Sequence, residues 1–273
     1  MHSWIDGQPG TAVNLQNRGL AYGDGLFETI AVRAGKPSLL QYHLDRLALG
    51  CQRLAIEADI PLIRDELLRF SSQLGEGVAK LVVTRGDSPR GYAPAPGAMA
   101  RRILQGAPLP AYPVVNADQG VSLYACKTRL AEQPLLAGLK HLNRLEQVLA
   151  RAEWQGAEFA EGLMRDTQGR LIEGVYSNLF LIRDDMLLTA DLSRCGVAGV
   201  MRAALLEHAP SLGLNPQVRD LEQADLEQAD EVFLCNSVYG IWPVRLFAEL
   251  NLNWSPGPLT RKLQAVARTL LDT

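Results

Sequence analysis

The chain has 273 residues, enough for one large domain or for two modest domains with separate cores. Its 47% hydrophobic and 21% charged residues are ordinary for a globular protein, and no stretch approaches the roughly eighteen apolar residues of a membrane span. The net charge of −3 supplies no basic surface, so neither nucleic acid nor an acidic membrane is expected as a partner.

The N-terminus and the cysteines indicate a cytoplasmic protein. The first residues contain no basic segment followed by an apolar run, so no signal peptide is expected. Cys51, Cys126, Cys195 and Cys235 lie far apart and form no C-x-x-C pair. We therefore expect buried free thiols in a reducing compartment, with neither disulfides nor a metal site.

The first half of the chain mixes predicted strands and helices. Helices are predicted for 41–55 and 61–74, because apolar residues recur on one stripe of each. Strands are predicted for 27–32, 79–84 and 101–104, with a short strand near the N-terminus and a hairpin turn at 34–37. No repeating βαβ unit is present, so this half is read as α+β, a sandwich of helices on a sheet.

A proline-rich stretch separates the two halves. Three prolines between 106 and 113 disfavour both helix and central strand and favour an extended connection. The predicted division is an N-terminal α+β domain at 1–106, a linker at 107–114 and a C-terminal domain at 115–273.

The second half is predicted to be a barrel-like β domain with helices. Strands are expected at 121–125 and 231–235, and hairpins join 161–166 to 170–173 and 178–183 to 186–189. A helix begins near 196–202, and a terminal helix covers 258–272 with its proline in the first turn.

Lys140 opens a segment whose apolar residues recur at helical spacing, so it is predicted to stand where a loop becomes a helix. Partial desolvation and a nearby helix N-terminus both favour the neutral amine, which can form a Schiff base. The alternative from spacing alone is a solvated lysine in the first turn of a surface helix.

Three further features add candidate chemistry. Glu173 is a carboxylate at a strand end, and Arg46 is a fixed cation whose planar fork suits a phosphate or carboxylate. The glycine-rich helix start at 196–202 offers backbone N–H groups for a phosphate. Taken singly, each also fits a structural role: a solvated strand end, a surface helix or a simple turn and cap.

Together these residues resemble the fold-type IV pyridoxal-phosphate (PLP) enzymes, which include branched-chain and D-amino-acid aminotransferases and 4-amino-4-deoxychorismate lyases. The resemblance covers nearly the whole chain, and ordered matches are more specific than any single motif. It rests on Gly19, Tyr22, Gly23, Asp24, Gly25, Phe27 and Glu28, on His43, Arg46 and Leu47, on Lys140 and Asn143, on Glu173, Ser177, Asn178, Leu179 and Phe180, and on Gly196, Gly199 and Arg202.

Within this class the stretch 137–148 and the pair Thr84-Arg85-Gly86 and Arg90-Gly91-Tyr92 resemble the lyases most. The resemblance implies conversion of 4-amino-4-deoxychorismate to 4-aminobenzoate and pyruvate, a step of folate synthesis. The alternatives are an aminotransferase for D-alanine or branched-chain amino acids and, from another class, a non-catalytic homologue that binds PLP or a partner.

The resemblance also implies the roles of individual residues. Lys140 would hold PLP and act as the mobile base, and Glu173 would keep the pyridine nitrogen protonated. Thr29 would place a hydroxyl near the reacting carbon, and a homodimer is implied. The remaining assignments are Arg46, Val200 and Met201, with Asn236 and Ser237, for the cofactor phosphate, and Arg90, Tyr92, Thr29 and Asn143 for the substrate.

Overall fold

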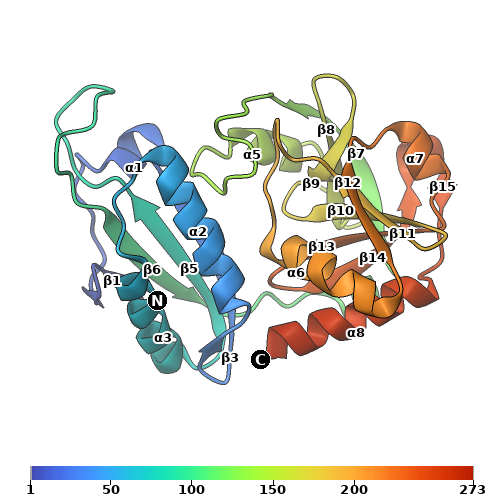
Figure 1. Ribbon diagram of the computed structural model, residues 1–273, viewed down its shortest axis with the longest axis horizontal. Helices are drawn as coiled ribbons and strands as arrows, with labels where there is room; N and C mark the ends of the chain where they lie inside the picture. The colour runs from blue at the N-terminus through green and yellow to red at the C-terminus, as the bar shows by residue number, and fades with distance from the viewer. Residues whose placement is uncertain (1, 273) are drawn as a thin grey trace. The chain divides into compact units, whose positions relative to one another are not determined.

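The computed structural model describes residues 2–272, which group into two compact units by their contacts (Figure 1). The first unit contains residues 2–110, Leu139–Asn143 and 271–272. The second contains Ala111–Gly138 and Arg144–Leu270. The change from one unit to the other after Pro110 falls inside the stretch predicted as linker, and the segment around Lys140 groups with the first unit.

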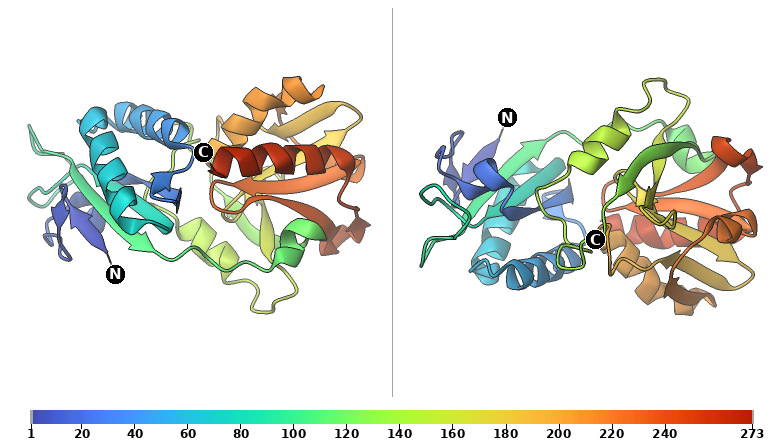
Figure 2. Two further views of the ribbon diagram at one scale, coloured as in Figure 1. Left: turned by 90° about the horizontal axis from the view of Figure 1, so that it is seen from below. Right: turned by 90° about the horizontal axis from the view of Figure 1, so that it is seen from above.

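The first unit is an antiparallel sheet with two long helices on one face (Figure 2). The strand order is β2-β1-β6-β5-β3-β4. Asp59 begins the second long helix, because its carboxylate accepts the Leu62 N–H at 2.9 Å. The elements are β1 (Ser3–Ile5), β2 (Gln8–Pro9), α1 (Arg18–Tyr22), β3 (Gly25–Arg33), β4 (Lys36–Pro37), α2 (Leu40–Leu54), α3 (Ile60–Leu74), β5 (Gly77–Thr84) and β6 (Arg101–Ala107).

The second unit is built on a closed ring of six strands. The ring runs β10-β13-β14-β7-β8-β9 and closes where β9 pairs again with β10; β11 and β12 extend from β10, and β15 pairs with β14. The predicted α+β class with a barrel-like second half is thereby confirmed. The strands are β7 (Val121–Leu130), β8 (Glu161–Asp166), β9 (Leu171–Gly174), β10 (Asn178–Arg183), β11 (Met186–Ala190), β12 (Asn215–Arg219), β13 (Glu231–Asn236), β14 (Gly240–Phe247) and β15 (Leu252–Asn253).

Helices and short turns cover this ring. The terminal helix has the predicted bounds and is anchored to β13, because the Glu231 carboxylate accepts the N–H groups of Leu259 (3.1 Å) and Thr260 (2.7 Å). None of the helices within residues 2–272 has the length and apolar character needed to cross a membrane. The helices are α4 (Val114–Asp118), α5 (Leu145–Arg151), α6 (Val200–His208), α7 (Gln223–Glu227) and α8 (Pro258–Asp272), with 3-10 turns η1 (Ala209–Leu212) and η2 (Ala248–Leu250).

The prediction that Lys140 opens a helix is wrong. Helix α5 begins at Leu145, and the residues just before it are not helical; His141 forms an isolated β-bridge with Leu26 of β3. The Phe27 N–H donates to the Lys140 carbonyl at 2.9 Å, and the Leu142 N–H donates to the Gly25 carbonyl at 3.0 Å. Two long-range backbone hydrogen bonds therefore replace the helical bonds that the apolar spacing suggested.

That apolar spacing does not mark a buried face either. Leu145 is 75% exposed, and Val148 and Leu149 are each 61% exposed in the single chain. The sequence reading also missed α1, where only turns were expected, and α4, which begins at the end of the predicted linker.

We expect Leu181→Ala to lower the free energy of unfolding by about 2–5 kcal/mol, because it leaves a cavity in a fully buried strand of the ring. Leu135→Ala removes the same atoms from a side chain that is 77% exposed and should change stability by less than about 0.5 kcal/mol. Denaturant unfolding of both variants measures the difference. Equal losses would contradict the core assignment.

Candidate active site

Strand β3 organises the candidate residues of the first unit. Its backbone pairs with the Lys140 segment, and the Lys140 Nζ lies 4.4 Å from the centre of the Phe27 ring. Thr29 is two residues further along β3, so it shares a face with Phe27. Asn143 is tied to the strand entry, because its Nδ2 donates to the Gly23 carbonyl at 3.0 Å. Lys140 and Asn143 are thus held beside the strand that carries Thr29, although more than one hundred residues separate them from it in sequence.

The other face of β3 carries a buried carboxylate with two basic partners. Glu28 Oε2 lies 2.5 Å from Nδ1 of His43, and its Oε1 accepts the Arg46 Nε–H at 2.8 Å. A second guanidinium N–H of Arg46 also donates to Glu28. Burial raises the pKa of Glu28, but Arg46 and His43 outweigh burial and lower it to about 2. Glu28 is therefore ionised and fixes the orientation of Arg46.

His43 is fully buried in this group. Burial lowers the pKa of His43, and although Glu28 opposes this effect, the positive charges of Arg46 and Lys140 add to it. The imidazole is therefore neutral at pH 7 and acts as a hydrogen-bond partner of Glu28.

Arg90 and Tyr92 lie on the loop between β5 and β6. Both side chains are exposed, Tyr92 to 87%. The ring of Tyr92 packs on Tyr22 with 5.6 Å between the ring centres. The side chains of Arg90 and Tyr92 are thus open to a ligand.

Glu173 occupies the end of β9 in the second unit, at the position where the ring of strands closes. It is 3% exposed, it faces Asn178 of β10 in the register, and its Oε2 accepts the Val197 N–H at 2.8 Å. Burial lowers the pKa of Arg144, whereas the negative charge of Glu173 opposes that shift. A carboxylate, a helix-leading loop and a guanidinium therefore share one region of this unit.

The backbone at the start of α6 is not covered by a capping side chain. Gly199 is the N-cap and gives no side-chain cap, so the N–H groups at Val200 and Met201 point out of the first turn. A Cβ at Gly199 would collide with the Asn178 side-chain oxygen, and Gly196 has a φ of +82°. Arg202 turns inward instead, where it donates to the Ala190 carbonyl at 2.9 Å.

Asn236 ends β13, Ser237 follows it, and Asn236 organises the turn there. Its Oδ1 accepts the N–H groups of Val238 (2.9 Å) and Tyr239 (3.0 Å), and its Nδ2 donates to the Tyr176 carbonyl at 3.3 Å. The described contacts of Asn236 therefore position the turn after β9.

Glu161 is a fully buried carboxylate that holds the same turn. Its Oε1 accepts the N–H groups of Gly162 and Val175, each at 3.0 Å. Its Oε2 accepts the Ser177 hydroxyl at 2.8 Å and the Tyr176 N–H at 3.3 Å. Burial raises the pKa of Glu161 to about 7, although these four hydrogen bonds oppose it.

The sequence analysis gave no role to Glu28, His43 or Glu161, although Glu28 and His43 belong to the motifs that carry the family resemblance. Glu28 precedes Arg46 by eighteen residues and meets it only because β3 and α2 pack together. No group of three or more His, Cys, Asp or Glu side chains in residues 2–272 is arranged to hold a metal ion. All four cysteines are free and buried, as predicted.

Comparisons with known proteins identify the family and the fold. Residues 25–247 match the family model described as amino-transferase class IV. The chain is similar to a crystal structure of 4-amino-4-deoxychorismate lyase from Pseudomonas aeruginosa, with 60% identity, a TM-score of 0.96 and coverage of 99% of this chain and 100% of the other.

Two curated relatives extend the comparison. Aminodeoxychorismate lyase of Vibrio harveyi is 38% identical over 97% of this chain and 99% of its own length. A putative branched-chain-amino-acid aminotransferase of Methanocaldococcus jannaschii is 29% identical over 92% of this chain and 88% of its own. Both lyases and aminotransferases therefore lie among the relatives, and the two lyases named here are more similar to this chain than the aminotransferase.

Glu161 should make the folded state less stable as the pH rises. Its pKa in the folded state lies above the ordinary value of 4.5, so the folded chain retains a proton that the unfolded chain releases. The free energy of unfolding of the native chain, minus that of Glu161→Gln, should fall by about 3 kcal/mol between pH 4.5 and pH 8. Denaturant unfolding across this range measures the difference.

Glu153→Gln is the matched control, because the contribution of Glu153 to stability should change with pH in the opposite direction. Burial raises the pKa of Glu153, but hydrogen bonds from Thr128 and Lys127 outweigh it and lower the pKa. Its contribution to stability is therefore present above its ordinary pKa and lost as the pH falls. Parallel pH curves for the native chain and Glu161→Gln would contradict the assignment to Glu161.

Proposed function

Because the chain belongs to the amino-transferase class IV family and has the fold-type IV architecture, we propose that it is a PLP-dependent aminodeoxychorismate lyase. The reaction converts 4-amino-4-deoxychorismate to 4-aminobenzoate and pyruvate, a step of folate synthesis. The observation that carries the proposal is the 60% identity to the Pseudomonas aeruginosa lyase over the whole chain.

The residues of the second unit fit the cofactor. The uncapped start of α6 offers N–H groups of Val200 and Met201 to a phosphate, and Gly199 leaves no side chain in the way. Glu173 is a buried carboxylate held by the Val197 N–H, as a partner for a protonated ring nitrogen requires. We assign Arg46, Asn236 and Ser237 to the phosphate as well, with Arg46 oriented by Glu28.

The cofactor supplies an electron sink for the pair released at the carbon that bears the substrate nitrogen. Lys140 anchors the cofactor and, once released, removes the proton from that carbon. Glu173 keeps a proton on the ring nitrogen, so that the sink retains its positive charge. The C–O bond to the enolpyruvyl group then breaks, and that group takes up a proton to become pyruvate while the substrate ring becomes aromatic.

The substrate is placed by residues of the first unit. Thr29 provides a hydroxyl near the reacting carbon, on the same face of β3 as Phe27, over which the Lys140 amine lies. Arg90 and Tyr92 meet the substrate carboxylates, which their exposed side chains allow, and Asn143 adds a polar contact.

An aminotransferase on the same fold is the second candidate, and the relative from Methanocaldococcus jannaschii favours it. It would use the same lysine, glutamate and phosphate site. Thr29, His141 and Arg144 are the residues that favour the lyase. A non-catalytic homologue is disfavoured, because Lys140, Glu173 and Arg46 are all present.

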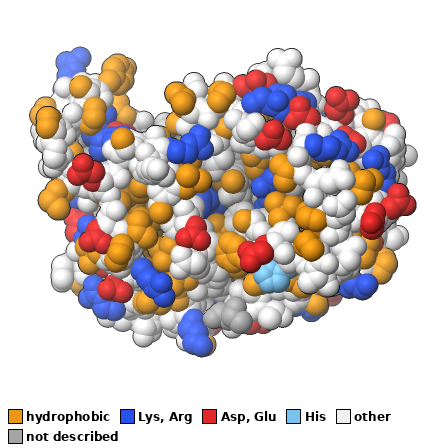
Figure 3. All heavy atoms as spheres, viewed as in Figure 1, with side chains coloured by type: hydrophobic (Ala, Val, Ile, Leu, Met, Phe, Trp, Pro, Cys, Tyr) orange, Lys and Arg blue, Asp and Glu red, His pale blue; other side chains and the backbone are white. Residues whose placement is uncertain are grey.

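The partner is a small molecule, and the assembly is a homodimer. The exposed apolar residues Leu145, Val148 and Leu149 on α5 support a dimer contact. On the face drawn in Figure 3, basic and acidic side chains are interspersed, which favours neither nucleic acid nor an anionic membrane. Four free cysteines support a cytoplasmic location.

Lys140→Ala should abolish the release of 4-aminobenzoate and pyruvate, because no other residue is assigned to anchor PLP or move the proton. Native enzyme with PLP should release the two products in equal amounts from enzymatically generated aminodeoxychorismate. Both products are followed in the same reaction, with and without PLP. Borohydride should trap PLP on the native chain but not on Lys140→Ala.

Other results would point elsewhere. A trapped adduct that persists in Lys140→Ala would contradict the assignment of the anchoring lysine. Amino transfer from D-alanine or leucine to 2-oxoglutarate, without release of 4-aminobenzoate, would move the chain to the aminotransferases.

A further inference from the structure

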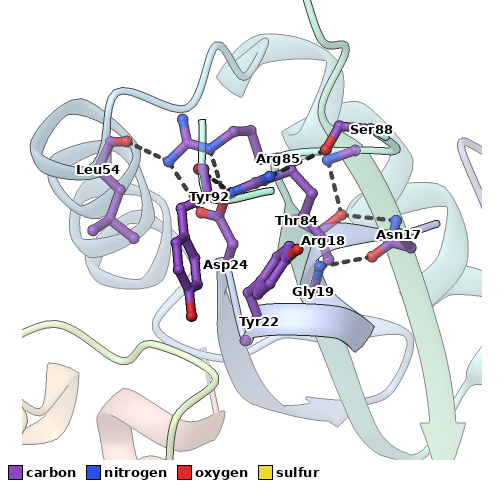
Figure 4. Close-up of polar contacts among 12 residues, drawn as sticks. Asn17, Arg18, Gly19, Tyr22, Asp24, Leu54, Thr84, Arg85, Ser88 and Tyr92 are labelled. Atoms are coloured by element: carbon purple, nitrogen blue, oxygen red, sulfur yellow. Dashed lines mark hydrogen bonds and ion pairs between the residues drawn. The ribbon is translucent and has the colours of Figure 1, made fainter. Parts of the chain in front are cut away.

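One buried guanidinium holds the backbone of the loop at 88–92. Arg18 is 4% exposed, and its Nη1 donates to the Gly91 carbonyl at 3.0 Å and to the Ser88 hydroxyl at 3.1 Å. Its Nη2 donates to the Tyr92 carbonyl at 2.8 Å (Figure 4). Gly91 has a φ of +127°, a conformation that favours glycine, and there the loop turns two successive carbonyl groups toward one side chain.

Tyr22, four residues after Arg18 on α1, holds the same loop from a second direction. The Gly91 N–H donates to the Tyr22 hydroxyl at 3.1 Å. The guanidinium of Arg18 lies 4.9 Å from the centre of the Tyr22 ring, a cation–π contact. Both backbone polar groups of Gly91 are therefore bound by side chains of α1.

Asp24 fixes Arg18 by sharing its carboxylate with Arg85. Asp24 Oδ2 accepts the Nε–H of Arg18 at 2.7 Å and the Nε–H of Arg85 at 2.8 Å, and Oδ1 accepts from Nη2 of Arg85 at 3.0 Å. Burial raises the pKa of Asp24, but Arg85 and Arg18 outweigh it and lower the pKa. The carboxylate is thus ionised and accepts one hydrogen bond from Arg18 and a bidentate pair from Arg85.

Arg85 extends this network to helix α2. It donates to the carbonyl groups of Leu54 at 2.7 Å and Ala55 at 2.6 Å, at the C-terminal end of the helix that carries Arg46. Figure 4 shows the Arg85 side chain between Leu54 and Asp24. The loop at 88–92 and helix α2 are therefore bound to one carboxylate through two arginines.

The charges of this network favour an anionic ligand. Arg18 and Arg85 share one carboxylate, which leaves one net positive charge, and exposed Arg90 adds another. A substrate with two carboxylates, such as the one assigned above, carries the complementary charge.

We propose that Arg18, oriented by Asp24 and Arg85, is a positioning residue that holds the loop at 88–92 so that Arg90 and Tyr92 bind the substrate carboxylates. Arg18 acts through the loop backbone and does not touch the substrate. The role in substrate binding rests on the proposed function, whereas the restraint of the loop can be tested without any substrate.

Arg18→Lys is the main test, because it keeps the charge and loses the fork that reaches Asp24 and the loop carbonyls together. We expect KM for aminodeoxychorismate to rise about tenfold or more, with kcat within about threefold of native, because binding shared by ground and transition states is lost. PLP absorbance and borohydride trapping on Lys140 should stay native, which shows that the variant is folded.

Limited trypsin digestion is the second readout. The loop contains the cleavable Arg90-Gly91 bond, and its cleavage rate follows the population of the open loop. Arg18→Lys should speed this cleavage about tenfold, measured by mass spectrometry of that peptide. Tyr22→Phe keeps the ring and removes only the acceptor for the Gly91 N–H, so it should give a smaller increase and serves if Arg18→Lys does not fold.

Arg64→Lys, on the exposed face of α3, is the matched control and should leave both readouts native. Unchanged trypsin cleavage in Arg18→Lys and in Tyr22→Phe would overturn the proposal. Faster cleavage with an unchanged KM would overturn the role in substrate binding. If native enzyme releases no 4-aminobenzoate, the proposed function fails, and trypsin cleavage alone decides whether Arg18 restrains the loop.

Discussion

The pairing of β3 with the segment around Lys140 is the contact on which the candidate site depends. The hydrogen bond from the Phe27 N–H to the Lys140 carbonyl joins residues more than one hundred positions apart. It places the lysine beside the strand that carries Thr29 on one face and Glu28 on the other. The first unit is therefore completed by a short piece of chain from the second half.

Three carboxylates that are buried or nearly so show how differently a negative charge can be kept in a protein interior. Glu28 is balanced by Arg46 and stays ionised, and Asp24 is shared by two arginines. Glu161 has only hydrogen-bond donors around it, so its pKa rises to about 7. Three tyrosines lie close enough for the negative charge of Glu161 to raise their pKa, and none of them supplies a cation: Tyr112, Tyr176 and Tyr239. Arginine side chains therefore stabilise the ionised carboxylates of Glu28 and Asp24, whereas Glu161 is stabilised by hydrogen-bond donors alone.

The sequence predicted the architecture well where local signals were strong. The bounds of β8, β10 and α8 were predicted to the residue, because turn residues and a first-turn proline mark them directly. The α+β class and the barrel-like second half followed from these elements together.

Long-range contacts limited the prediction of the site. Lys140 was singled out, but the prediction that it opens a helix was wrong. Its segment forms two backbone hydrogen bonds with β3, and the seven-residue helix begins only at Leu145. Asp24 appeared only as a member of a motif and Arg18 only as its neighbour, because the loop at 88–92 that they hold lies some seventy residues away. The roles of Glu173 and Arg46 toward a cofactor stay predictions.

The ring of strands in the second unit also sets an order of events during synthesis. Strand β7 needs β14 as a parallel neighbour, and these strands are separated by more than one hundred residues. Glu173 sits at the join between β9 and β10, yet the ring around it closes only after β13 and β14 have left the ribosome. A nascent chain that already contains Lys140 and Glu173 therefore still lacks the closed ring around Glu173, so this unit completes its fold only late in synthesis.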